Sequence, residues 1–164
     1  MRQMIAKADL VKTDAEIVQL LLPGACVEPL EIDFDRAEKN VREVRVTVND
    51  AFHGQVQIDG VRATRSFPFR GDRMLFTLRP NQWSSAIPYA EVGQASITIG
   101  IEGRNNAETI KQELDRQQKI LGEYTEWSTT LINQHNARLE GLLAAAVARR
   151  REHLASLEDL KSRI

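Results

Sequence analysis

The densest group of residues that could do chemistry is an acidic run between residues 28 and 38. Its members are Glu28, Glu31, Asp33, Asp35 and Glu38, and five acids against Arg36 leave a net charge of −4. Neighbouring carboxylates can bind Mg²⁺ or act as general acid and base. A nuclease-like site would add a lysine beside them, and Lys39 lies at no recognisable spacing. A solvated loop is the simpler interpretation, and an enzyme that uses these acids is our third hypothesis.

The opposite imbalance lies between residues 61 and 80, where five arginines stand against Asp72 alone. The arginines are Arg62, Arg65, Arg70, Arg73 and Arg79. Arginines on a sheet face with phenylalanines nearby could bind phosphates or stack on bases. Nucleic-acid or nucleotide binding is therefore the alternative function. The same arginines could instead meet the acidic segment 28–38, within one molecule or between two.

Histidine and cysteine are too sparse to indicate a metal centre or a nucleophilic site. The histidines are His53, His135 and His153, and no two have the close spacing typical of zinc ligands. The single cysteine, Cys26, has no histidine near it in the sequence, so an inert thiol is the simpler interpretation. Neither a phosphate-binding glycine loop nor a serine elbow occurs. We predict no catalytic residue, no metal and no cofactor.

The composition is that of a globular chain. Apolar residues make up 42% of its 164 residues and charged residues 27%, which suffices for a compact core. The net charge of −1 gives no overall attraction to nucleic acid or to an acidic membrane. No apolar run approaches the ~20 residues of a membrane helix, and the first residues lack the apolar stretch of a signal peptide. We expect a cytoplasmic protein that does not enter a membrane.

Proline divides the chain near residue 104. All five prolines and seven of the nine glycines precede this point. Because proline interrupts helices and interior strands, the first two thirds should be rich in turns and the last third helical. The predicted organisation is a helix plus a β-rich body over residues 1–104 and a helical arm over residues 105–164.

The body predicts an α+β fold with a short helix and five or six strands. Residues 13–22 begin with capping residues and end at Pro23-Gly24, which is typical of an amphipathic helix. Alternating apolar and polar residues predict an antiparallel sheet or a small sandwich. The expected strands are 27–32, 44–48, 55–58, 61–65, 74–78 and 95–101, with Asp59-Gly60 as a hairpin turn.

Apolar residues recur in the arm every 3.6 residues after a cap at Asn105 or Asn106. A strict heptad fails beyond Leu131, so the pattern favours an ordinary helix over a supercoiled dimer. An unbroken helix over 106–162 would extend ~84 Å. Because residues 133–136 are polar and Gly141 follows, we expect a kink or a turn between 133 and 141, with one long helix as the alternative.

The second half of the arm predicts an interaction surface. Its residues are Leu139, Leu142, Leu143, Leu154, Leu157 and Leu160. These leucines need a cover, which could be a folded-back first helix, a second subunit or a downstream domain. The chain also looks as though it ends in mid-helix, so we expect it to continue. The leading hypothesis is a non-enzymatic regulatory or assembly module, homodimeric, that positions a downstream partner.

One resemblance supports a downstream domain. The run Phe67-Pro68-Phe69-Arg70-Gly71-Asp72 with Leu75-Phe76 and Pro80, followed by Trp127, Asn136, Leu139 and Arg150-Arg151, resembles the N-terminal regulatory regions of multidomain bacterial effector proteins. Some of those carry a C-terminal domain like the Toll/interleukin-1 receptor domain and are linked to defence against phage. The resemblance covers roughly residues 60–155 and implies no catalytic residue here.

Overall fold

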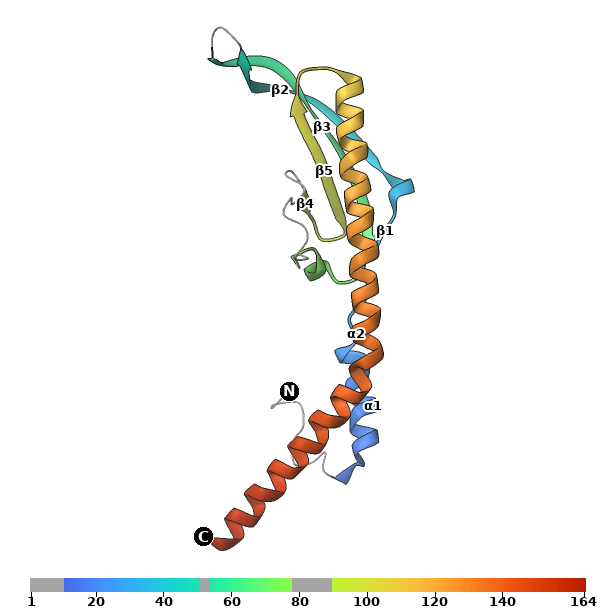
Figure 1. Ribbon diagram of the computed structural model, residues 1–164, viewed down its shortest axis with the longest axis vertical. Helices are drawn as coiled ribbons and strands as arrows, with labels where there is room; N and C mark the ends of the chain where they lie inside the picture. The colour runs from blue at the N-terminus through green and yellow to red at the C-terminus, as the bar shows by residue number, and fades with distance from the viewer. Residues whose placement is uncertain (1–10, 51–53, 78–89) are drawn as a thin grey trace. The chain divides into compact units, whose positions relative to one another are not determined.

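The computed structural model describes residues 11–50, 54–77 and 90–164. These residues form an α+β arrangement with an N-terminal helix, an antiparallel sheet and a long C-terminal helix (Figure 1), which confirms the predicted fold class. The elements in chain order are α1 (Asp14–Ala25), β1 (Glu31–Ile32), the 3-10 helix η2 (Phe34–Arg36), β2 (Glu38–Asp50), β3 (Gly54–Arg70), the 3-10 helix η3 (Arg73–Thr77), β4 (Glu91–Val92), β5 (Ser96–Gly103) and α2 (Ala107–Arg163).

The chain forms two compact units, and their boundaries differ from the expected division at residue 104. The described part of Met1–Val27 together with Leu131–Ile164 makes one, called here the helix-pair unit. Glu28–Thr130 makes the other, called here the sheet unit. Helix α2 contributes to both, because its apolar face packs against the sheet in one unit and against α1 in the other.

Strand β3 is the centre of the sheet. The strand order is β1-β3-β5-β4, and β2 also pairs with β3. Strand β3 pairs with β2 from Glu38↔Ser66 to Asp50↔Gly54, and with β5 from Val61↔Gly103 to Pro68↔Ser96. Residues 54–60 of β3 therefore lie beyond the end of β5 and form a two-stranded ribbon with β2, as Figure 1 shows.

The expected hairpin turn at Asp59-Gly60 is wrong, because both residues lie inside β3. Segments 55–58 and 61–65 are thus one strand, and β2 and β3 are joined through residues 51–53, outside the described part. Gly60 is needed because neighbouring atoms approach its backbone closely, and not because the chain turns there. A Cβ atom there would lie 2.5 Å from the Gly103 carbonyl oxygen and 2.6 Å from a methyl of Val46. No side chain fits without displacing the backbone.

The strand expected at 74–78 is also wrong: residues 73–77 form the 3-10 helix η3, and Leu78 lies outside the described residues. Asp72 causes the local turn, because its side chain accepts a hydrogen bond from Met74 N at 2.9 Å and its carbonyl accepts one from Leu75 N at 3.0 Å.

The strand expected over 27–32 shrinks to β1. Those expected at 44–48 and 95–101 are confirmed within β2 and β5 (95 itself precedes the strand).

Helix α1 begins where the sequence predicts. Thr13 and Glu16 form a capping box, with Thr13 N donating to Glu16 Oε2 at 2.7 Å. These hydrogen bonds to Thr13 lower the pKa of Glu16. The helix continues through Pro23 to Ala25, so its expected end at Pro23-Gly24 comes slightly too early. A proline in the last turn disrupts little, because few helical hydrogen bonds remain to be formed there.

Helix α2 is continuous through residues 133–141, so the expected turn into two helices is wrong and the alternative of one long helix is confirmed. Asn106 is the capping residue, since its side chain accepts a hydrogen bond from Thr109 N at 3.1 Å. The polar residues that suggested a break have a different role. The Asn136 side chain donates to Val27 O at 2.9 Å and accepts from Val27 N at 3.2 Å. The Asn136 amide thereby provides hydrogen-bond partners for the backbone N–H and C=O groups of Val27.

The core of the sheet unit lies between α2 and one face of the sheet. Its most deeply buried side chains are Leu30, Phe67, Ile97, Ile99 and Leu121. The buried Gln117 of α2 donates from Nε2 to Gly100 O of β5 at 3.1 Å. This bond, made to a strand backbone from within an apolar layer, fixes the position of the helix along the sheet.

Candidate functional site

The structure divides the six predicted interaction leucines into two groups of three. Leu139, Leu143 and Leu154 are buried within the chain itself. Leu142, Leu157 and Leu160 are exposed, with 54%, 46% and 57% of their surface accessible. Large apolar residues that stay exposed side by side on one helix are candidates for contact with another molecule.

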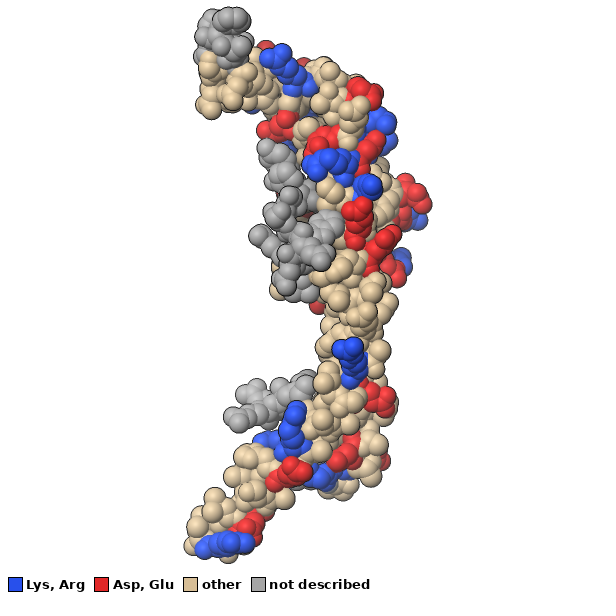
Figure 2. All heavy atoms as spheres, viewed as in Figure 1, with Lys and Arg blue, Asp and Glu red and all other residues tan. Residues whose placement is uncertain are grey.

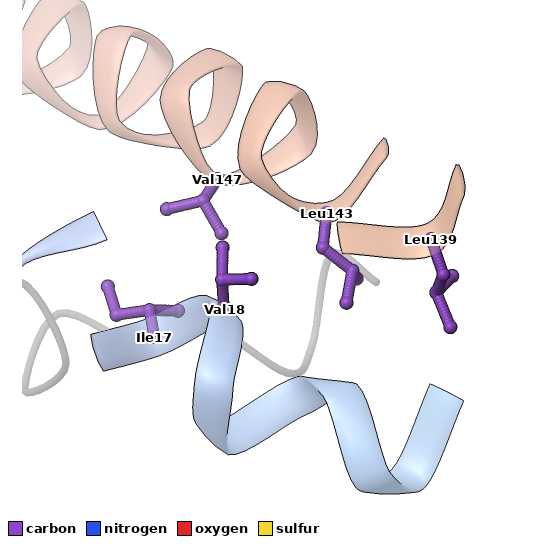
Figure 3. Packing of buried hydrophobic residues seen from close by; sticks show 5 residues of the cluster. All are labelled: Ile17, Val18, Leu139, Leu143 and Val147. Carbon is purple, nitrogen blue, oxygen red and sulfur yellow. The ribbon is translucent and has the colours of Figure 1, made fainter. Parts of the chain in front are cut away.

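Helix α1 supplies the cover for the buried part. Ile17 and Val18 of α1 point at one face of α2, where they contact Leu139, Leu143 and Val147 (Figure 3). The partly buried Leu21, Leu22 and Ala25 pack around this cluster. Of the three covers that the sequence left open, a folded-back first helix therefore accounts for residues 139–147.

An ion pair anchors the first turn of α1. Arg151 Nε lies 2.7 Å from Asp14 Oδ1, and Arg151 Nη2 donates to Lys12 O at 2.8 Å. The contacts hold the end of α1 beside residue 151 of α2. Helix α1 begins at this point, so it places no helical residue farther along α2.

Leu139 and Leu157 differ by cover and not by direction, whereas Leu142 and Leu160 point about 60° or more away from the buried leucines. Leu139 and Leu157 are 18 residues apart, which is five turns at 3.6 residues per turn, so they point the same way. Leu139 is 5% exposed and Leu157 is 46% exposed. We call the exposed set of Leu142, Leu157, Leu160 and Ile164 the open stripe. Its three leucines lie within about 60° of one another around the helix, and Ile164 directly follows the last residue of α2.

The five arginines of the alternative hypothesis do not form one surface. Arg62 and Arg65 lie on opposite faces of β3, because side chains alternate along a strand. Arg70 is exposed at the end of β3, Arg73 donates to Gln94 at 3.1 Å, and Arg79 lies outside the described residues. Figure 2 likewise shows basic and acidic side chains interleaved on the visible face.

Carboxylates engage the two arginines in the middle of β3. Arg62 lies 2.9 Å from Glu91 and 3.5 Å from Glu102. Arg65 lies 2.6 Å from Asp115 on α2. Hydrogen bonds from Lys111 and Arg65 hold the pKa of Asp115 below its usual value. The Arg62 guanidinium thus links β3 to Glu91 of β4 and Glu102 of β5, and that of Arg65 links β3 to α2. Neither group can bind an anion without breaking an ion pair.

The acidic segment 28–38 lies beside the end of β3. Glu31 is paired with Arg70 across the β1–β3 ladder, and Asp33 N donates to Pro68 O at 2.9 Å. Arg70 thus lies beside the acidic segment, whereas Arg62 and Arg65 pair with carboxylates elsewhere in the sheet unit. Asp33 accepts hydrogen bonds from the backbone of residues 35 and 36 and so caps η2. Its carboxylate stabilises a turn.

In residues 11–50, 54–77 and 90–164, no group of three or more histidine, cysteine, aspartate or glutamate side chains is placed to hold a metal ion. None of the described helices combines the length and the apolarity that a bilayer crossing requires.

Sequence reasoning missed three contacts of the helix-pair unit. These are the Asn136–Val27 bonds, the Arg151–Asp14 pair and the assignment of Ile17 and Val18 to the face around Leu143. Each joins residues more than 100 positions apart, and no local pattern specifies such a partner. The only sequence signal was the apolar face itself.

Comparison with known proteins adds no assignment. No protein-family model matches the sequence, and no curated protein or solved structure shows a significant similarity. The geometry of the open stripe is therefore the strongest basis for a functional inference.

Proposed function

We propose that the chain is a cytoplasmic, non-enzymatic assembly module whose open stripe binds the open stripe of a second copy and thereby positions a downstream partner or effector domain. The observation that carries this proposal is the pair Leu139 and Leu157. They share one direction on α2, and only the first has a cover. A second helix lying along residues 142–164 would continue the cover that α1 provides up to residue 147.

The chemistry of the stripe favours a second copy in antiparallel orientation. A two-fold axis at His153 places Leu142 opposite Ile164 and Ala146 opposite Leu160. It also places Arg149 opposite Leu157. A parallel arrangement would instead set Arg149 against Arg149 of the second copy, and like charges in contact are unfavourable.

The size of the stripe predicts a reversible dimer. Burying the exposed part of each half-exposed leucine contributes about 1 kcal/mol at 25 cal/mol per Å². Three half-exposed leucines and the almost fully exposed Ile164 from each copy give about 10 kcal/mol in all, which is similar to the cost of about 4–15 kcal/mol for bringing two molecules together. Association should therefore depend strongly on concentration, and a downstream domain that also associates would strengthen it.

Sedimentation velocity over a concentration series up to high micromolar tests the proposal. We expect a concentration-dependent self-association, and the double variant Leu142→Glu/Leu157→Glu should associate more weakly than the parent, because only contacts outside the open stripe remain. Leu20→Glu is the matched control, because Leu20 is 63% exposed but lies on α1, and this variant should associate like the parent. A parent chain that stays monomeric, or a double variant that associates normally, would refute the proposal.

Nucleic-acid binding and the resemblance to effector proteins remain predictions. The ion pairs of Arg62 and Arg65 do not favour binding of an anion to the arginine-rich strand. A downstream effector domain would agree with the proposed role, since an assembly module acts by bringing such domains together.

A further inference from the structure

Strand β2 has one unpaired edge in the described part of the chain. It pairs over all 13 of its residues with β3, and no described strand pairs with its other side. Val41 of β2, the register partner of Ala63, is 67% exposed. A long, open edge strand is a template for another strand.

We infer that β2 pairs with β2 of a second copy, antiparallel and about a two-fold axis at Val44, so that two sheet units join into one continuous sheet. This interface lies in the sheet unit and is separate from the open stripe of α2. It does not depend on the proposed function.

Geometry restricts the registers that such a pair can adopt. Two antiparallel neighbouring strands are related by a two-fold axis perpendicular to the sheet, so both copies present the same face on the same side. Directly opposite residues also lie on one face. Two residues that face each other must therefore have numbers that are both even or both odd. The two-fold axis then passes between one residue and the same residue of the second copy.

Charge then selects among these registers. An axis at Glu43 places two carboxylates in contact, and an axis at Arg42 or Arg45 places two guanidinium groups in contact. An axis at Val44 sets valine against valine. It also places Glu43 opposite Arg45 of the second copy, and this pair occurs twice because of the symmetry.

The axis at Val44 also gives the longest overlap. Val44 is the midpoint of β2, so all 13 residues of each strand find a partner. An axis at Val46 would also be free of like-charge contacts, but it would pair only residues 42–50. The unfavourable pair at this register, Glu38 opposite Asp50, also occurs twice, and it lies at the two ends of the joined strands, where pairing is weakest.

The inferred pair extends a charge pattern that the sheet already contains. Arg45 Nε lies 3.7 Å from Asp59 of β3, with both side chains exposed. In the joined sheet, Arg45 would stand between Asp59 of its own chain and Glu43 of the second copy. A guanidinium group between two carboxylates gives specificity of register more than strength, because exposed ion pairs are individually weak.

Charge reversal tests the inference in the full chain, with Leu142→Glu/Leu157→Glu present so that the open stripe does not contribute. Glu43→Arg alone and Arg45→Glu alone should each weaken self-association by about tenfold or more, since each creates two like-charge pairs. An equimolar mixture of the two variants should associate again, because every Arg then meets a Glu. The double variant Glu43→Arg/Arg45→Glu should associate more tightly than either single variant, because each Arg again meets a Glu, but it loses the pair with Asp59.

Sedimentation velocity at low salt measures these effects, and thermal melting confirms that each variant is folded. The inference is overturned if the parent does not self-associate, if single reversals have no effect, or if the mixture fails to recover. Because the open stripe is disabled throughout, failure here leaves the proposed function standing, and failure of the proposed function leaves this result unchanged.

Cysteine cross-linking tests the register. In a Cys26→Ser background, Val44→Cys should form a disulfide-linked dimer under mild oxidation, because paired Cα atoms lie ~4.5–5.5 Å apart. Thr47→Cys is the matched control: its two copies would be offset by six positions, or ~20 Å, and should not cross-link. Efficient cross-linking through Val46→Cys in place of Val44→Cys would overturn the inferred axis.

Discussion

Helix α2 is covered in one way in the sheet unit and in another in the helix-pair unit. In the sheet unit, Leu114, Gln117 and Leu121 are buried against the sheet. In the helix-pair unit, the cover is α1, whose 12 residues span ~18 Å. A short helix can protect only a matching length of its neighbour. Within the covered length Leu142 points away from α1 and stays exposed, and beyond it Leu157 and Leu160 remain available to another molecule.

The largest effect should come from the core of the sheet unit. Leu121→Ala should lower the free energy of unfolding by about 3–5 kcal/mol, because Leu121 is 2% exposed and its removal leaves a cavity between α2 and the sheet. Urea denaturation followed by tryptophan fluorescence measures the change. Glu123→Ala, an exposed position two residues away, should stay close to the parent. A loss below 1 kcal/mol in Leu121→Ala would contradict the assigned core.

The smaller cluster under α1 should respond less. Leu143→Ala should cost about 2 kcal/mol, at the lower end of the range for buried leucines, because few residues surround it. The adjacent Leu142→Ala should change stability by less than about 0.5 kcal/mol in the monomer. Hydrogen exchange of the amides in residues 139–150 reports on this region. Equal effects at the two positions would contradict the division between buried and open leucines.

Next comes the side-chain link between Asn136 and Val27. Asn136→Ala should destabilise the helix-pair unit by about 1–2 kcal/mol, because the Val27 backbone loses two hydrogen-bond partners. Asn136→Asp keeps the acceptor but removes the donor and places a carboxylate against the Val27 carbonyl, so it should be no better than alanine. Faster exchange of the Val27 amide would report the loss. An unchanged exchange rate in both variants would argue against this link.

The smallest effect concerns pH and the first part of α2. Hydrogen bonds from Arg116, with a further one from Gln117, lower the pKa of Glu113 to about 2. A depressed carboxyl pKa stabilises the fold above its unfolded value of about 4.5, and this contribution is lost as the pH falls from about 5 to 2. Glu113→Gln should flatten stability over that range in urea titrations. If the stability of the variant fell as steeply with decreasing pH as that of the parent, other carboxylates would dominate the acid dependence.

Local patterns specified several elements correctly. The capping box at Thr13, the cap at Asn106 and the alternation within 44–48 each depend on neighbours in sequence, and each forms the predicted element. Periodicity failed where a distant partner reassigned a residue. Asp59-Gly60 has the composition of a turn, yet the glycine is required by the nearby Gly103 carbonyl. Asn136 suggested a break, yet it binds the backbone of Val27.

What the sequence alone determined is the period of α2, the position of its beginning and the side of the helix that is apolar. It could not decide which leucines on that side are covered, because Leu139 and Leu157 are equivalent by residue type and by direction. Only the packing of α1 against residues 139–147 separates them. Burial depends on contacts between residues more than 100 positions apart, and local physical chemistry does not encode where a neighbouring element ends.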